Sequence, residues 1–236
     1  MVYIDLPEMQ STRRLSFYLA MEEYVARRLE IPECFFMSQV APTEIFGRNQ
    51  SMENEVNEDY CRRHHIQMYR RKSGGGCVYA DEGNVMLSMI TTGEDVHFAF
   101  HQFVGMLTLV LRKLGVAAVG TSHNDVLIGD KKVSGSATYH LPGRNIVHST
   151  LLYDTDMEHM LHAITPSREK LQSKGIQSVR QRITLLKDYT HLPLADVKTV
   201  IRQTLCSGSY ELTAAQVAEI EQLEAAYLNE DFIRLL

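Results

Sequence analysis

Cysteine is scarce in this sequence, and its placement is irregular. The four cysteines are Cys34, Cys61, Cys77 and Cys206, and no two of them form a CxxC pair. This spacing argues against a zinc site and against a framework of disulfides. A chain without disulfides suits a reducing compartment, so we expect a cytoplasmic protein.

Segments that direct a chain to a membrane are also missing. Residues 1–10 contain acids and a proline but no apolar stretch of the kind found in signal peptides. No apolar run approaches the roughly 20 residues that cross a bilayer. The net charge is −5, so no general positive field attracts nucleic acid or anionic lipid. We therefore expect neither nucleic acid nor a membrane as a partner.

The two common glycine motifs of nucleotide-binding proteins, the Walker loop and the Rossmann fingerprint, do not occur. A different glycine-rich stretch, RRKSGGGCV, stands at residues 70–78. Glycine lets the backbone bend through φ > 0 and approach a ligand without a Cβ in the way. Successive N–H groups in such a turn bind anions, and adjacent arginines can clamp phosphate in a bidentate manner. The stretch predicts a phosphate site, although a glycine-rich hairpin with a solvated basic edge explains the same residues.

The first part of the chain is rich in strand patterns. A strand at 43–46 and a polar helix at 52–64 are expected before the glycine-rich stretch. Strand-like runs at 66–69, 78–80 and 85–91 predict a β-meander around it.

The later part of the chain is predicted to be more helical. Apolar residues spaced by three and four over 96–114 predict a core helix that Gly115 ends. Residues 190–236 are predicted as a helical segment in which Thr213 and Gln216 form a capping box. The length of 236 residues and the hydrophobic content of 44% suit a domain with a sizeable core.

A second polar block runs from Asn124 to Ala137. It predicts two short strands around a turn at Gly129 and Asp130, with small residues soon after Lys132. Small side chains leave room for a bulky group against the strand, although a simple hairpin with exposed lysines explains the pattern too. In a strand, Lys132 and its neighbour Lys131 point to opposite faces.

Together, these blocks resemble the lipoate–protein ligase A family over nearly the whole chain. The motifs that carry the likeness are LAMEE from Leu19, GRNQ from Gly47, the glycine-rich stretch, DEGN from Asp81, Asn124 with Asp125, KVSGSA from Lys132 and KGIQSVR from Lys174. The resemblance implies an α+β fold with a mixed, mainly antiparallel sheet flanked by helices, as in biotin–protein ligases. It implies one catalytic domain over residues 1–236, and we expect no C-terminal accessory domain.

The resemblance implies a reaction in two steps. Lipoate or octanoate attacks the α-phosphate of ATP, in the presence of Mg²⁺, and forms an acyl-adenylate and pyrophosphate. The acyl group then passes to a lysine of an acceptor domain in a 2-oxoacid dehydrogenase complex or of the glycine cleavage H protein. A separate protein carrying the accessory domain is a further expected partner.

Lys132 is the expected catalytic residue. By resemblance it contacts the lipoyl carbonyl and the α-phosphate, where positive charge is needed. The residues expected to bind ATP and lipoyl-adenylate are Arg70, Arg71, Ser73, Gly74, Gly75, Gly76, Cys77, Val78, Asn84, Asn124, Asp125, Lys132, Gly135, Ser136, Ala137 and His148. Asp125 or Asn124 either orients Lys132 or helps to hold Mg²⁺, which takes few protein ligands beside phosphate oxygens.

Two other functions stay open. An octanoyl or lipoyl transferase of the same superfamily would carry the acyl group on a cysteine, and Cys77 is the candidate near the site. A non-catalytic lipoate or lipoyl-adenylate-binding protein would use Lys132 and the glycine-rich loop for binding alone. Cys77 and Ser149 stand where the family often has alanine and glycine, which leaves the preferred acyl group open.

Overall fold

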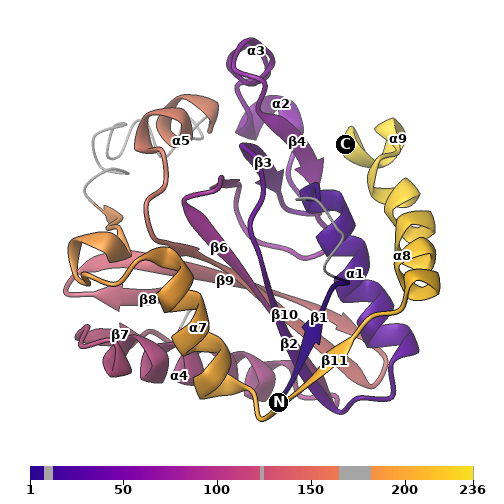
Figure 1. Cartoon of the computed structure of the whole chain (residues 1–236). Helices are drawn as coiled ribbons and strands as arrows, with labels where there is room; N and C mark the ends of the chain where they lie inside the picture. Colours follow the sequence, from indigo (N-terminus) through magenta and orange to yellow (C-terminus); the bar gives the residue numbers. More distant parts are fainter. Residues whose placement is uncertain (8–12, 123–124, 165–181, 236) are drawn as a thin grey trace.

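A large mixed sheet forms the centre of the molecule (Figure 1). The computed structural model describes residues 1–7, 13–122, 125–164 and 182–235. The strands lie in the order β11 (Gly208–Glu211), β1 (Val2–Asp5), β2 (Glu33–Ser38), β6 (Asn84–Thr92), β10 (Arg144–Leu152), β9 (Lys131–Leu141), β8 (Asp125–Ile128) and β7 (Ala118–Gly120). β1 pairs in parallel with β2 and β11, and the other described pairings of this sheet are antiparallel. The predicted α+β class with a mainly antiparallel sheet is confirmed.

Side chains of the central strands point alternately to the two faces of the sheet, and this divides the hydrophobic core in two. Phe35 and Met89 lie in one apolar cluster, and their neighbours Phe36 and Ile90 lie in the other. Successive side chains of a strand point to opposite faces, so each face of the sheet has its own core.

Helices cover both faces of the sheet. The described helices are α1 (Leu15–Arg28), α2 (Met52–Glu55), α3 (Glu58–Arg63), α4 (Val96–Lys113), α5 (Met157–Ala163), α7 (Leu194–Leu205), α8 (Ala214–Tyr227) and α9 (Glu230–Ile233), with a 3₁₀ turn at Leu186–Asp188. α4 and α7 contribute to one core, and α1 and α8 to the other (Figure 1). No helix in the described ranges is both long and apolar enough to span a membrane.

The predicted β-meander around the glycine-rich stretch is wrong. The strands on either side of that stretch, β4 (Gln67–Arg70) and β5 (Val78–Ala80), do not pair with each other. Both pair with β3 (Thr43–Phe46), which lies between them in a separate small sheet. The following strand, β6, belongs to the large sheet instead. β3 supplies a partner edge on each side, so the glycine-rich stretch becomes a crossover loop rather than a hairpin.

Two further predictions need correction. The helix expected at 52–64 is broken into α2 and α3, because Val56 between them forms a bridge with Ile164 and Asn57 caps α3. The C-terminal part also contains a strand, β11, which the helical pattern did not reveal. β11 pairs with β1 at the other end of the chain, so each strand finds its partner only in the folded molecule.

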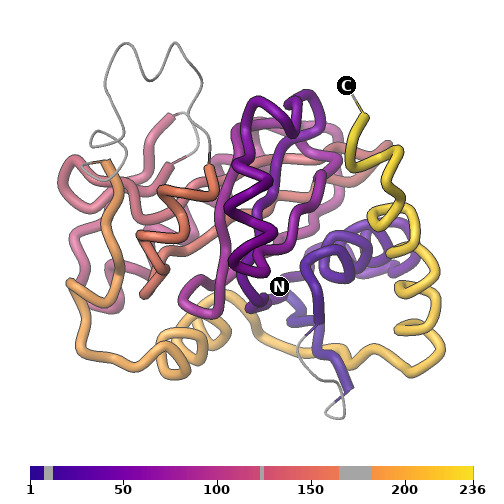
Figure 2. Tube along the Cα trace, turned by 90° about the horizontal axis from the view of Figure 1, so that it is seen from above, coloured from indigo at the N-terminus to yellow at the C-terminus, as the bar shows by residue number. Residues whose placement is uncertain are grey.

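Local signals were otherwise reliable. Asp95 caps α4 by accepting a hydrogen bond from the Phe98 N–H, and Gly115 follows the helix with φ +81°. The capping box of Thr213 and Gln216 is present at the start of α8. Figure 2 shows the C-terminal segment (yellow) running beside α1 (indigo).

Candidate active site

The glycine-rich loop crosses from β4 to β5 in contact with the loop after β3. Gly75 adopts φ +90°, a conformation that favours glycine. A Cβ at Gly47 would lie 2.3 Å from the Gly75 carbonyl oxygen, and the Arg48 N–H donates to the Ser73 carbonyl at 2.9 Å. Two motifs that are separate in the sequence therefore form one packed unit. A Cβ at Gly74 or Gly76 would meet no described atom within 4 Å, so the loop is open above these two residues.

The two arginines of the loop do not form the phosphate clamp that the sequence suggested. Arg70 is fully buried, and its guanidinium donates to main-chain carbonyls of two distant segments. These acceptors are Gly47, Arg48 and Gln50 from the loop after β3, and Phe232, Ile233 and Leu235 from the C-terminal segment. A buried guanidinium in which every nitrogen donates to a main-chain carbonyl supports the loop from behind instead of facing a ligand.

Arg71 has the same kind of environment inside the loop. Its guanidinium donates to the carbonyls of Ile45, Gly74 and Gly76 at 2.7–3.2 Å. Burial lowers the pKa of Arg71 to about 10, so the side chain stays charged near neutral pH. Both arginines thus fix the path of the loop through main-chain carbonyls.

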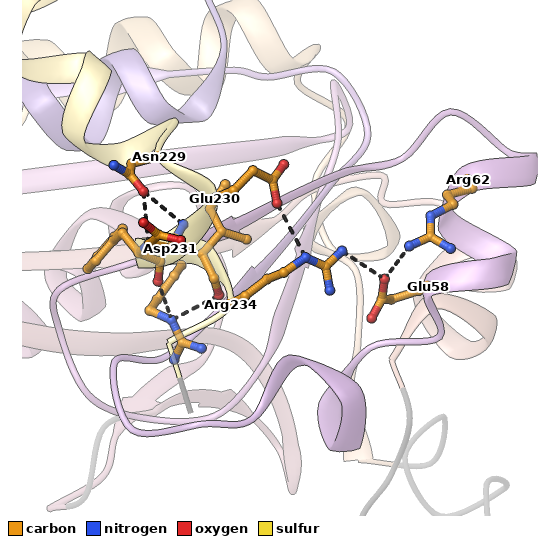
Figure 3. A network of polar contacts seen from close by, with 9 residues as sticks. Glu58, Arg62, Asn229, Glu230, Asp231 and Arg234 are labelled. Carbon is orange, nitrogen blue, oxygen red and sulfur yellow. Dashed lines mark hydrogen bonds and ion pairs between the residues drawn. The ribbon is translucent and has the colours of Figure 1, made fainter.

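The C-terminal carbonyls that hold Arg70 are themselves held in place (Figure 3). Asn229 caps α9 by accepting from the N–H groups of Asp231 and Phe232. Arg234 donates to Glu230 and to Glu58 of α3, each at 3.3 Å. Exposed ion pairs of this kind contribute little stability singly. The buried Arg70 is therefore the main polar link between the C-terminal segment and β4.

Ser73 and His148 come together beneath the loop. The Ser73 hydroxyl lies 2.7 Å from Nε2 of the buried His148, which β10 supplies. Across the β9–β10 pairing, His148 stands opposite Ala137, and a Cβ at Gly75 would lie 3.9 Å from the Ala137 Cβ. Folding therefore brings four of the predicted site residues, from the glycine-rich loop, β9 and β10, to one place.

Lys132 lies on β9 with its ammonium 2.7 Å from a carboxylate oxygen of Asp125 on the neighbouring strand β8. The lysine side chain crosses directly over Gly135, where a Cβ would stand 2.5 Å from both Cε and Nζ of Lys132. The small residue after Lys132 therefore makes room for the lysine itself. Lys131 is exposed. In the ligand-free chain Asp125 takes the first of its two expected roles, the orientation of Lys132.

The side chains of the remaining predicted site residues form no hydrogen bond or ion pair with Lys132 or with the Ser73–His148 pair in the described structure. Asn84 is fully buried, its side-chain amide donates to the Tyr79 carbonyl, and its carbonyl oxygen accepts from Thr155. Asn84 is predicted to bind ATP or lipoyl-adenylate. In the structure its buried side chain instead supports the turn before β6. Val78 begins β5, and the buried Ser136 hydroxyl has no partner among the described residues. Asn124 and residues 174–180 lie outside the described part of the chain.

Cys77 points away from the open side of the loop toward a buried acid that the sequence gave no reason to select. Its thiol donates to Glu44 at 3.1 Å, and the other carboxyl oxygen of the fully buried Glu44 has no partner in the described structure. Burial raises the pKa of Glu44 to about 8. Burial, and then Glu44, raise the pKa of the Cys77 thiol well above its usual value. Both groups are therefore protonated at neutral pH, which makes Cys77 a poor nucleophile.

Glu44→Gln is expected to flatten the pH dependence of stability. Folding raises the pKa of Glu44 from 4.5 to about 8, so the folded state binds this proton more tightly than the unfolded chain. The free energy of unfolding of the parent then falls as pH rises through that window. At about pH 9 the variant should be more stable by on the order of a few kcal/mol, and at about pH 5 this advantage should vanish.

Urea unfolding at the two pH values measures the effect. Glu53→Gln, at an exposed position, is the control and should follow the parent. Parallel pH profiles for Glu44→Gln and the parent would contradict a proton held on Glu44.

Solved structures with this fold define its class. A bi-partite lipoate protein ligase of Thermoplasma acidophilum matches with a TM-score of 0.88 and 24% identity, over 100% of this chain and 98% of that one. A structure described as lipoate-protein ligase A bound with ATP matches with a TM-score of 0.84 and 22% identity, over the whole of both chains. The fold is that of lipoate–protein ligases.

Sequence comparison gives the family. The model of the lipoyl protein ligase A/B catalytic domain matches residues 15–206, and the chain belongs to this family. Lipoate–protein ligase 1 of Staphylococcus aureus is 36% identical over an alignment of 213 residues, which covers 87% of this chain and 65% of that protein. The ligase LplJ of Bacillus subtilis is 34% identical over 80% of this chain and 57% of its own length. The chain thus spans less than two thirds of these two relatives.

Proposed function

We propose that this chain is an ATP-dependent lipoate–protein ligase. It activates lipoate or octanoate as an acyl-adenylate and transfers the acyl group to a lysine of an acceptor domain. The observation that carries the proposal is the position of Lys132, whose ammonium lies over Gly135 on the strand that the glycine-rich loop approaches. The names of its relatives support the proposal, as do neighbours of the same fold described with bound ATP and with bound lipoic acid.

The residues suit adenylate formation. A carboxylate that attacks ATP brings two anions together, and a preorganised positive charge lowers the energy of that encounter. We assign this charge to Lys132. When the substrates bind, its ammonium would move from Asp125 to the substrate oxygens. The N–H groups of Gly74, Gly75 and Gly76 are assigned to the phosphates, because the loop is open above Gly74 and Gly76. No enzyme nucleophile is required, since the mixed anhydride already activates the acyl group.

Asp125 is the residue we assign to Mg²⁺. Its carboxylate is partly exposed and lies beside the lysine that would face the phosphates, so it suits a cation that arrives with ATP. Mg²⁺ neutralises phosphate charge when bound, and it typically uses one or two carboxylates together with phosphate oxygens and water.

The transferase alternative is weakened by the environment of Cys77. A thioester mechanism needs a thiolate, and burial together with Glu44 raises the pKa of this thiol. Non-catalytic binding of lipoate or lipoyl-adenylate would use the same Lys132 and loop, so only a measurement of chemistry separates it from ligation.

The test is acylation of an acceptor domain with ATP, Mg²⁺ and either lipoate or octanoate. Mass spectrometry follows the acceptor, and a coupled assay follows pyrophosphate. A ligase gives a lipoyl or octanoyl mass increase together with pyrophosphate. Acyl transfer without ATP from an octanoyl thioester of a carrier protein, supplied in place of the free acid, would indicate a transferase. Lipoate binding without pyrophosphate release would indicate a binding protein. Synthetic lipoyl-adenylate in place of ATP and lipoate tests the second step alone.

The proposed partners follow from the same chemistry. We propose lipoyl-acceptor domains of 2-oxoacid dehydrogenase complexes or the glycine cleavage H protein, and the Thermoplasma ligase was studied with its E2 lipoyl domain. That ligase is described as bi-partite, so a second protein carrying an accessory domain is also a candidate. The four free cysteines support a cytoplasmic location.

A further inference from the structure

Two adjacent acids are buried in α1, among apolar core residues. Glu22 and Glu23 are each 6% exposed. A buried carboxylate is costly unless charged or hydrogen-bonding partners compensate it. Neither residue has a role in the reaction proposed above, so their partners indicate what they do.

Glu23 holds Lys72, which is part of the glycine-rich loop. One carboxylate oxygen lies 2.6 Å from the Lys72 ammonium, and Tyr227 of α8 donates to the same oxygen at 3.1 Å. The other oxygen accepts from Arg27 at 2.9 Å. Burial alone would raise the pKa of Glu23, but Lys72 and Arg27 outweigh it and hold the pKa below its usual value. Glu23 thus fixes a loop residue through a partly buried ion pair.

Glu22 holds the next loop residue through a histidine. Its carboxylate accepts from Ser88 at 2.5 Å and lies 2.9 Å from Nδ1 of His148, whose Nε2 lies 2.7 Å from the Ser73 hydroxyl. A carboxylate can only accept hydrogen bonds, so Nδ1 carries a proton. In the neutral imidazole, Nε2 then accepts from the Ser73 hydroxyl. The chain Glu22–His148–Ser73 is buried throughout.

Both links end immediately before the three glycines. Lys72 and Ser73 are the last residues with side chains before Gly74, and the glycines themselves have none by which to be anchored. A glycine segment loses more conformational entropy on ordering than any other, so fixed flanking residues matter most here. Glu22 and Glu23 point in different directions because successive helix residues are rotated by about 100°. They therefore hold the two flanking residues independently.

We propose that Glu22 and Glu23 are positioning residues that order the glycine-rich loop for ATP. Glu22 acts through His148 and Ser73, and Glu23 acts through Lys72. The kinetic part of this inference rests on the proposed ligase function, whereas the ordering of the loop is a property of the ligand-free chain.

The experiment compares Glu22→Ala, Glu22→Gln and Glu23→Gln with a matched control, Glu224→Ala. Glu224 is also a buried acid at the α1–α8 contact, but its partners, Ser16 and Arg14, lie at the start of α1 and outside the loop. Glu22→Ala and Glu23→Gln should raise KM for ATP about ten- to a hundredfold, with a smaller change in kcat. Glu22→Ala removes the acceptor of His148, and Glu23→Gln removes the negative charge that holds Lys72. Glu22→Gln keeps an acceptor for His148, so its KM for ATP should lie close to that of the parent.

Hydrogen exchange of ligand-free protein provides a readout that needs no activity. Amides of residues 72–77 should exchange faster in Glu22→Ala and Glu23→Gln, and at the parent rate in Glu224→Ala. Ser73→Ala cuts the same link at the loop without touching α1, and it should reproduce the faster exchange of Glu22→Ala even where that variant folds poorly.

Parent-like exchange in folded Glu22→Ala and Glu23→Gln, or equal loosening in Glu224→Ala, would overturn the proposal. A parent protein that releases no pyrophosphate would refute the ligase function, and the exchange data would still decide whether these glutamates order the loop.

Discussion

Lys132→Ala should reduce the rate of adenylate formation by about a hundred- to a thousandfold, the usual cost of removing one preorganised electrostatic contact. The ammonium lies over Gly135 of β9, the strand that the glycine-rich loop approaches, and in the ligand-free chain its partner Asp125 fixes its direction. The side chain is partly exposed, so its removal should leave the fold intact. Pyrophosphate release measures the rate, and circular dichroism checks the fold.

Lys131→Ala is the matched control. Lys131 is the exposed neighbour of Lys132, and its loss should be close to neutral. A greater loss of rate with Lys131→Ala than with Lys132→Ala would show that the wrong lysine has been assigned. Near-normal pyrophosphate release by Lys132→Ala would exclude an essential electrostatic role for this residue.

Gly135→Ala tests the same assignment without removing the charge. The new Cβ would overlap the end of the Lys132 side chain, which is flexible and can move aside. The fold should therefore survive while the ammonium is displaced, and the rate should fall about tenfold or more, because a misplacement of about 1 Å costs up to a hundredfold. Unchanged pyrophosphate release would mean that the position of the ammonium over Gly135 is unimportant.

Gly75→Val should lower ATP-dependent adenylation by about a hundredfold, because the loop N–H groups lose their positions. Gly75 has φ +90°, which a β-branched residue adopts only under strain, and a Cβ would stand 3.0 Å from Nη2 of Arg71. Arg71 holds the carbonyls on both sides of Gly75, so its displacement would spread through the loop. Adenylation is measured as pyrophosphate release.

A second measurement separates lost binding from lost fold. Lipoyl-adenylate should raise the melting temperature of the parent and have little effect on Gly75→Val. Gly115→Val is the control, since Gly115 also has φ +81° but follows α4 and has no described atom within 4 Å of a Cβ. It should lower stability and leave ligand stabilisation intact. Equal stabilisation of Gly75→Val and the parent would make the glycine-rich turn merely structural.

Some site contacts were accessible from sequence and some were not. Lys132 with Asp125, and Ser73 with His148, were among the residues selected from motifs, and folding brings each pair together. Glu22, Glu23 and Glu44 were not given roles, because a glutamate in a helix or strand pattern carries no signal of its partner. Glu23 lies four residues before Arg27, which is equally typical of a helix that simply pairs its own charges.

By itself, the sequence determined features that depend on near neighbours. The spacing of apolar residues specified α4, Thr213 and Gln216 specified the cap of α8, and the three consecutive glycines specified an open loop. Each of these depends on interactions within a few residues, so composition and spacing are sufficient.

Only the tertiary structure decided which groups the charged side chains meet. Arg70 is suited in sequence to a phosphate, yet carbonyls from residues 47–50 and 232–235 surround it. The same holds for β1 and β11, which pair across almost the full length of the chain. A guanidinium binds carbonyl or phosphate oxygens alike, and a strand edge accepts any strand of matching register. The choice among such partners is made by packing between distant segments, which near-neighbour patterns do not encode.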